Sequence, residues 1–258
     1  MRIIVTRPLE QAEATVAALH QQGLDAVALP LIDILPPQEV QPLQQAWRVL
    51  DQFACVMFVS ANAVVHFMRQ RPPQVQWPVQ VLAASTGPGT AAALLQAGVP
   101  RQAVVAPAAD QYDSEALWLQ LKPHDWAARR VLVVRGEGGR DWLAEQLAAA
   151  GASVQFVAAY VRALPSSLGA GQAVLDRALA NPAEHLWAFS SSQALGHLQH
   201  LAAGANWSKS RAVAAHPRVA DSARRLGFGR VDVGPLTPQA LAAAVQAAPA
   251  GHLQSGAP

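Results

Sequence analysis

Short aliphatic runs alternate along the chain with longer segments of helical character. The aliphatic runs are continuous, which is typical of strands that are covered on both faces. Strands are predicted over residues 2–6, 25–29, 54–59, 79–83 and 103–105, and again over 130–134, 153–160, 185–189, 211–214 and 230–233. Helices are predicted over residues 9–22, 40–50, 61–68, 88–97 and 114–121, with counterparts downstream. This alternation predicts an α/β fold with parallel sheets and right-handed crossovers.

The second half of the chain repeats the first at a nearly constant offset. Residues 3–7 match 131–135 at an offset of 128, 58–64 match 189–195 at 131, and 82–88 match 211–217 at 129. Glycines that end helical segments recur in the same order, Gly23 with Gly151 and Gly98 with Gly227. A positive φ costs glycine little at such positions. The shared order indicates an internal duplication and predicts two flavodoxin-like parallel-sheet domains, each with strand order 2-1-3-4-5.

Residues 29–36 and 156–165 occupy the same place in the two repeats, and both segments look extended and end in Leu-Pro. They could pair as a two-stranded connector between the domains. Domain 1 would then be discontinuous, formed by residues 1–35 and 163–258, and domain 2 would span residues 36–162. This interleaved arrangement would leave a cleft between the lobes. Two contiguous halves are the alternative, and the sequence leaves it open.

Composition narrows the class of protein. The 258 residues suit two domains of about 125 residues each. Apolar residues make up 52% and charged residues only 14%, with a net charge of +2 and no dense basic patch, so a nucleic-acid partner is not indicated. No apolar run reaches the roughly 18–20 residues of a membrane span, and no signal peptide is apparent. The single Cys55 favours a reducing, cytoplasmic location, and a monomer is expected.

Candidate chemistry lies at the predicted carboxyl ends of the strands, where open parallel sheets bind ligands. Small hydroxyl residues, glycines and arginines recur there, each near the start of a helix. The candidate substrate-binding residues are Arg7, Ser60, Asn62, Thr86, Gly87, Thr90, Arg135, Gly136, Arg140, Ser191, Ser192, His216 and Arg218. Helix N-termini attract anions, and guanidinium groups match carboxylates. The set predicts an anion site, although ordinary helix capping explains any one hydroxyl residue equally well.

Other motifs are missing or incomplete. The glycine clusters 87–89 and 136–139 lack the spacing of a dinucleotide-binding or phosphate-binding loop. His197 and His200 lie one helical turn apart, but no further ligands accompany them, so they are interpreted as surface histidines. No nucleophile elbow is present. The sequence therefore predicts neither a metal site nor a cofactor.

Taken together, several short motifs resemble the uroporphyrinogen-III synthase family. They are Val5-Thr6-Arg7-Pro8, Phe58-x-Ser60-x-Asn62-Ala63-Val64, Gly87–Ala91 with Gly98, Arg135–Arg140, Ala159-Tyr160, Phe189-Ser190-Ser191 and Thr237–Leu241. Each motif is weak alone, and their shared order from residue 1 to about 247 carries the resemblance. One departure is that the second repeat, with His216 and Arg218, lacks the Gly-x-x-Thr form found at Gly87–Thr90. The second repeat is therefore expected to bind its carboxylate through side chains.

The resemblance implies an interleaved two-domain fold with the active site between the lobes. It also implies the reaction: dehydration and cyclisation of linear hydroxymethylbilane, with inversion of its last pyrrole ring, to give uroporphyrinogen III for haem and sirohaem synthesis. That substrate carries eight carboxylates, in agreement with an anion site. Tyr160 matches the tyrosine of the family that helps the hydroxyl group leave. Transient contact with the preceding enzyme of the pathway, which would hand over the unstable substrate, is a further expectation.

Two rival functions share the anion-binding features. A non-catalytic, two-lobed binding protein for an acidic small molecule would normally be exported and carry a signal peptide. A sugar or nucleotide enzyme should show a phosphate loop or a pair of catalytic carboxylates. The sequence shows none of these signals, so the synthase is the preferred hypothesis.

Overall fold

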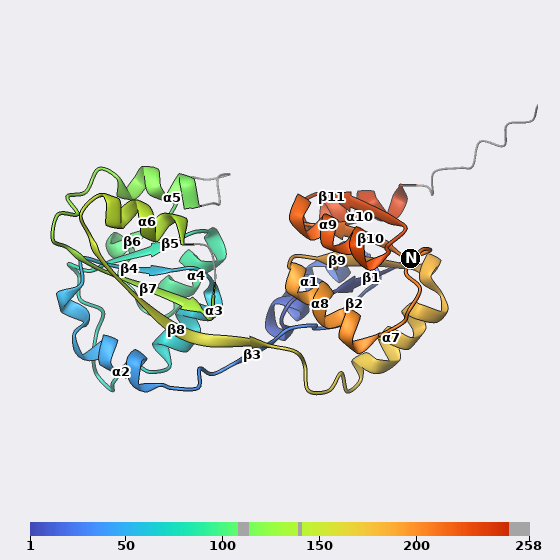
Figure 1. Cartoon of the computed structure of the whole chain (residues 1–258), viewed down its shortest axis with the longest axis horizontal. Coiled ribbons are helices and arrows are strands. Elements are labelled where there is room, and N and C mark those ends of the chain that lie inside the picture. Colours follow the sequence, from blue (N-terminus) through green and yellow to red (C-terminus); the bar gives the residue numbers. More distant parts are fainter. Residues whose placement is uncertain (108–113, 139–140, 248–258) are drawn as a thin grey trace, which may run out of the picture. The chain divides into compact units, whose positions relative to one another are not determined.

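The computed structural model describes residues 1–107, 114–138 and 141–247. The chain forms two compact units: unit 1 consists of Met1–Asp33 and Ala163–Pro258, and unit 2 of Ile34–Arg162 (Figure 1). It therefore passes from one unit to the other twice. In the described parts of the chain, no helix combines the length and the apolar character that a membrane span requires.

Unit 1 is built on a five-stranded sheet of order β11-β10-β9-β1-β2, with every recorded pair parallel. Its strands are β1 (Arg2–Val5), β2 (Ala26–Ala28), β9 (His185–Phe189), β10 (Arg211–Ala214) and β11 (Arg230–Val233). Its helices are α1 (Leu9–Gln21), α7 (Gly171–Ala180), α8 (Ser192–Leu201), α9 (Pro217–Leu226) and α10 (Pro238–Gln246). Numbered along the chain within this unit, the order is 2-1-3-4-5, as predicted.

Unit 2 is built on a six-stranded sheet of order β3-β8-β7-β4-β5-β6. Its strands are β3 (Asp33–Leu35), β4 (Cys55–Phe58), β5 (Leu82–Ser85), β6 (Val104–Val105), β7 (Arg130–Gly136) and β8 (Ser153–Ala163). Its helices are α2 (Gln41–Arg48), α3 (Ala61–Met68), α4 (Pro88–Gln96), α5 (Ser114–Leu121) and α6 (Trp142–Ala149). If β7 and β8 are counted first, as their places in the repeat require, the parallel core again has the order 2-1-3-4-5. The extra strand β3 lies beside β8, and these two strands are the predicted connector.

Equivalent aromatic residues fill the core of each unit. Phe58 at the end of β4 contacts Trp77, with ring centroids 6.1 Å apart. In unit 1, Phe189 at the end of β9 contacts Phe228 at 5.5 Å, and Phe228 stacks on Trp207 at 5.0 Å. Phe58 precedes Phe189 by 131 positions and Trp77 precedes Trp207 by 130, so both repeats place an aromatic pair of the same spacing in the core.

The boundaries of several elements differ from the prediction, among them those of β5 and α2. The strand predicted over 79–83 forms at Leu82–Ser85, because residues 78–81 make a turn in which Val81 N–H bonds the Pro78 carbonyl at 3.0 Å. The Trp77 indole fixes that turn by donating to the Val81 carbonyl at 2.8 Å. The helix predicted over 40–50 ends at Arg48, and a short 3₁₀ turn follows at Leu50–Gln52. Positive φ angles of 73°, 84°, 96° and 103° confirm the predicted helix-ending roles of the four repeat glycines.

A buried hydrogen bond joins the first strand of unit 1 to its neighbour at the carboxyl end. Thr6 Oγ1 donates to the Ala188 carbonyl at 2.8 Å, and Thr6 is 1% exposed. We expect Thr6→Val to lower the free energy of unfolding by about 1 kcal/mol, because the valine keeps the volume but loses a buried bond. Thr15→Val is the control, since Thr15 bonds only a carbonyl of its own helix and is partly exposed. Equal losses in urea titrations of the two variants would contradict this assignment.

Candidate functional site

The structure places the candidate residues at the carboxyl ends of neighbouring strands within each unit. In unit 1, Arg7 follows β1, Ser191 and Ser192 follow β9, and His216 and Arg218 follow β10. In unit 2, Ser60 and Asn62 follow β4, Thr86, Gly87 and Thr90 follow β5, and Arg135 and Gly136 end β7. The strands β10, β9 and β1 are neighbours in one sheet, and β7, β4 and β5 are neighbours in the other. Each unit therefore brings its own set of candidate residues together at the carboxyl end of its sheet. Arg140 lies outside the described residues.

Three of these residues cap helices. Ser60 Oγ accepts from Ala63 N–H and Ser191 Oγ from Gln193 N–H, both at 3.2 Å. His216 Nδ1 accepts from Arg218 N–H at 3.2 Å. An accepting Nδ1 leaves the proton of the neutral imidazole on Nε2, and His216 is exposed. Capping and ligand binding are compatible here, since other N–H groups of each first turn have no partner within the helix.

Arg7 is a cation without a recorded counter-ion. Its side chain is partly buried, and its Nε is enclosed without a hydrogen-bond partner. Burial lowers the pKa of the Arg7 guanidinium from its usual value. Within the described residues no carboxylate forms an ion pair with it. A partly buried guanidinium with an enclosed, unbonded Nε is costly in the free protein, and an anionic ligand would relieve part of that cost.

The other two described arginines of the set differ from Arg7. Arg135 forms an ion pair with Asp141 and lies over the Phe156 ring, with its guanidinium carbon 4.2 Å from the ring centre. Arg218 is exposed at the first turn of α9. Arg135 is therefore already engaged by protein groups, whereas Arg218 faces solvent.

Tyr160 is fully buried, and its hydroxyl is held by two partners from unit 2. Ser60 Oγ lies 3.0 Å from the Tyr160 hydroxyl, and Arg162 Nη2 donates to that hydroxyl at 3.2 Å. A bulge in the β7–β8 pairing sets Gly136 opposite Tyr160. A Cβ at Gly136 would lie 2.8 Å from two ring carbons of Tyr160, so only glycine leaves room for this ring.

Two residues near these edges were not predicted as part of the site. Arg162 lies two positions after Tyr160, and in a strand this spacing places both side chains on one face. The two-residue spacing from Tyr160 could therefore have identified Arg162 as a site residue from the sequence alone. Ser85 is fully buried at the end of β5, and its hydroxyl has no recorded partner. It comes directly before Thr86 and Gly87, beyond the strand predicted over 79–83, so its place near the carboxyl end was predictable and its burial was not.

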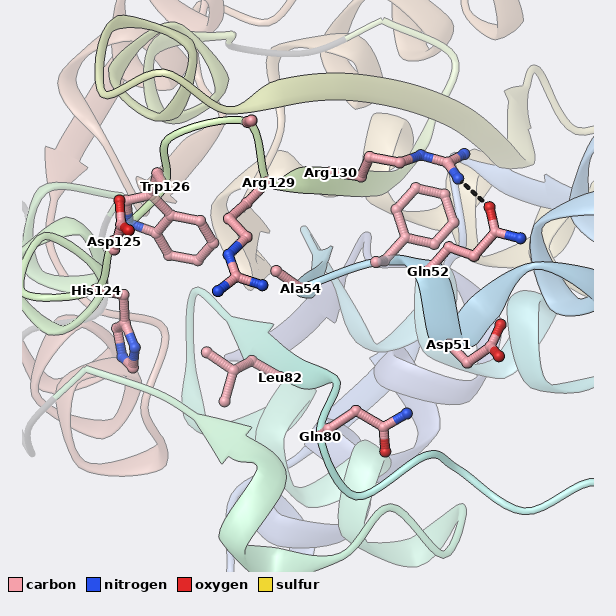
Figure 2. A pocket seen from close by; sticks show the side chains of 12 residues that line it. Asp51, Gln52, Ala54, Gln80, Leu82, His124, Asp125, Trp126, Arg129 and Arg130 are labelled. Atoms are coloured by element: carbon pink, nitrogen blue, oxygen red, sulfur yellow. Dashed lines mark hydrogen bonds between the residues drawn. The ribbon is translucent and has the colours of Figure 1, made fainter.

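A hollow lies at the amino ends of the strands of the unit 2 sheet, opposite the candidate residues. It has a volume of about 560 Å³ and adjoins the amino ends of β4, β5 and β7. Figure 2 shows the Arg129 guanidinium near the middle of this hollow, and Arg130 bonded to Gln52 at its rim. None of the candidate residues lines it. Its size alone does not make it the site, since parallel sheets bind ligands at the carboxyl ends of their strands.

We expect Gly136→Ala to lower the free energy of unfolding by about 1–3 kcal/mol, because the methyl group must displace the buried Tyr160 ring. Gly89→Ala is the matched control, since nothing lies within 4 Å of a Cβ at Gly89. Urea titration measures both variants. A Gly136→Ala protein as stable as the Gly89→Ala control would show that the Tyr160 ring is not confined by this contact.

Comparisons with known proteins identify the family. The model of the family "Uroporphyrinogen-III synthase HemD" matches residues 13–240. Uroporphyrinogen-III synthase of Salmonella typhimurium is 33% identical over 177 residues, which cover 67% of this chain and 70% of that protein. The Escherichia coli enzyme is 32% identical over 175 residues, with the same two coverages.

Solved structures agree on the fold. Uroporphyrinogen-III synthetase from Helicobacter pylori aligns with a TM-score of 0.59 at 16% identity, covering 95% of this chain and all of that chain. A mutant uroporphyrinogen III synthase from Thermus thermophilus aligns with a TM-score of 0.56 at 20% identity, covering 95% and 99%. At such identities the structural match speaks for the architecture, and the sequence matches carry the assignment. The chain belongs to the uroporphyrinogen-III synthase family.

Proposed function

We propose that this protein is a uroporphyrinogen-III synthase, a lyase that removes water from linear hydroxymethylbilane and closes it with inversion of the last ring. Family membership over residues 13–240 is the observation that carries the proposal. The product, uroporphyrinogen III, is the precursor of haem and sirohaem. The enzyme acts in the cytoplasm as a monomer and receives its unstable substrate through transient contact with the preceding enzyme.

The binding chemistry suits a polyanion. The substrate carries eight carboxylates, and the candidate residues offer N–H groups of helix first turns, hydroxyls and two arginines without recorded acidic partners, Arg7 and Arg218. Helix N-termini stabilise an anion by roughly 0.3–1 kcal/mol each. We propose that Ser60, Asn62, Thr86, Gly87 and Thr90 bind carboxylates in unit 2, and that Arg7, Ser191, Ser192, His216 and Arg218 do so in unit 1. Arg135, Gly136 and Arg140 complete the proposed set.

The substrate itself drives most of the bond-making and bond-breaking in this reaction. The pyrrole nitrogen expels the hydroxyl group and leaves an azafulvene-type electrophile, which a ring carbon of the same substrate attacks. A spiro intermediate then reopens and closes to give the inverted ring. The protein must supply a proton to the departing hydroxyl, in which Tyr160 takes part, and a shape that brings the two ring carbons together. Most of the rate enhancement would therefore come from positioning.

A non-catalytic receptor for an acidic small molecule is the alternative function. It would share the anion-binding edges. The relatives that define the family are enzymes by name, so the catalytic proposal is favoured.

Incubation of the purified protein with hydroxymethylbilane tests the proposal. The products are oxidised, and the type I and type III isomers are separated by chromatography. Closure without inversion gives type I, so we expect type III to dominate only when the protein is present. A type III yield no higher than that of the protein-free reaction would end the synthase proposal and leave the receptor as the alternative.

Arg7→Met is expected to separate stability from binding. Loss of the enclosed, unpaired guanidinium should raise the free energy of unfolding by about 1 kcal/mol. Loss of a charged contact to a carboxylate should raise KM about ten-fold.

Arg2→Met is the control for this variant, because Arg2 lies at the other end of β1 and pairs with Asp25 on the surface. It should change neither KM nor stability appreciably. An Arg7→Met enzyme with the KM of the wild type would remove Arg7 from the binding set.

A further inference from the structure

The buried phenol of Tyr160 contacts a hydroxyl group that is itself partly exposed. Tyr160 is 0% exposed, so in this conformation its oxygen cannot touch a bound substrate. Ser60 Oγ lies 3.0 Å from that oxygen, and Ser60 is partly exposed at the carboxyl edge of the unit 2 sheet. A proton from Tyr160 can therefore reach this edge through Ser60.

Either hydroxyl can be the donor between Ser60 and Tyr160, and the other contacts of the pair favour Tyr160 as the donor. Arg162 Nη2 donates to the Tyr160 hydroxyl at 3.2 Å, and a guanidinium can only donate. The buried phenolic hydrogen needs an acceptor, and Ser60 Oγ provides one. Ser60 Oγ also accepts from Ala63 N–H at 3.2 Å. With both of these contacts accepted, the hydrogen of Ser60 itself is left to donate outward.

We propose that Ser60 is the catalytic proton donor to the departing hydroxyl group, and that Tyr160 is a positioning residue which replaces the proton of Ser60 in the same step. This inference rests on the proposed function and deepens it. The C–O bond breaks and its electron pair stays on the oxygen, while the pyrrole nitrogen supplies electrons to the carbon. The Ser60 proton joins that oxygen to form water, and the Tyr160 proton moves to Ser60 Oγ.

The step balances without an added reactant. Tyr160 is left as a phenolate beside the Arg162 guanidinium, which stabilises its charge. After the final ring closure, the pyrrole ring carbon that has formed the new bond loses its proton, and that proton returns through Ser60 to Tyr160. The net change is the loss of one water molecule with no oxidation or reduction. The N-terminus of α3, which Ser60 caps, favours negative charge at this point.

The duplication supplies a comparison within the chain. Ser191 caps α8 in unit 1 as Ser60 caps α3 in unit 2. The segment of the first repeat that corresponds to Tyr160 contains the apolar residues Leu31 and Ile32. The cap is therefore present in both repeats, whereas the phenol is present in one. Helix capping alone does not account for the tyrosine.

Ser60→Gly tests the proposal, because glycine keeps most of the capping stability and removes the hydroxyl. We expect kcat to fall about 100-fold, the usual contribution of a general acid. KM should rise much less, because the carboxylate that Ser60 helps to bind keeps its contacts with the N–H groups of the helix first turn. Ser60→Thr restores both hydroxyl and cap and should recover kcat to within about three-fold of the wild type. Ser60→Asn also caps without a hydroxyl, and it serves if the glycine variant does not fold.

Thr237→Gly is the matched control. Thr237 caps α10 by accepting from Ala240 N–H at 3.3 Å, and it lies outside the proposed site. It should keep the kcat of the wild type.

A proton inventory distinguishes the relay from a purely structural role for Ser60. Single-turnover rates are measured in mixtures of H₂O and D₂O. The wild type should give a curved dependence on deuterium content, since two protons move together. Tyr160→Phe should be slower, with a linear dependence. A linear dependence in the wild type, or a Ser60→Gly enzyme with undiminished kcat, would overturn the relay. Neither result would bear on the proposed function. That proposal fails only if the wild type makes no more type III product than the protein-free reaction.

Discussion

Parallel pairing of the strands determines where the candidate residues gather in each unit. Parallel pairing brings the carboxyl ends of neighbouring strands to one edge, and the helices that follow begin there. Residues far apart in the chain thereby become neighbours. Ser60 and Tyr160 are 100 positions apart, yet their hydroxyls lie 3.0 Å from each other. The contact exists because β4 pairs with β7 and β7 with β8.

Each unit contains strands from both repeats, and this determines which residues meet in the Ser60–Tyr160 contact. The second repeat supplies β7 and β8 to unit 2, and the first repeat supplies β4 to β6. Tyr160 therefore meets a serine from the other copy of the repeat. Duplication followed by this exchange allows the two copies to diverge: one capping serine has a buried phenol behind it, and the other has none.

Much of the fold was predictable from the sequence, whereas the internal contacts of the site were not. Continuous aliphatic runs and the repeat offset gave the strand order of both sheets, and the repeat glycines gave the helix ends. The position of β5 was predicted incorrectly, because the Trp77 indole stabilises a turn before it that no local sequence motif indicates. The Arg135–Asp141 pair and the space that Gly136 leaves for Tyr160 depend on side-chain packing. A strand bulge sets the second of these contacts, and the sequence does not reveal it.

Binding of the octacarboxylate product tests most directly whether the carboxyl edges of the sheets hold the ligand. Backbone amide resonances of the protein are followed by NMR during an anaerobic titration with uroporphyrinogen III. We expect the largest shifts on the first turns of the helices after β4, β5, β9 and β10, at Ser60–Ala63, Gly87–Ala91, Ser191–Gln193 and Arg218. The amides lining the hollow at the amino ends, such as those of Gln52 and Arg129, should stay unshifted. Shifts confined to that hollow would show that the ligand does not bind at the carboxyl ends.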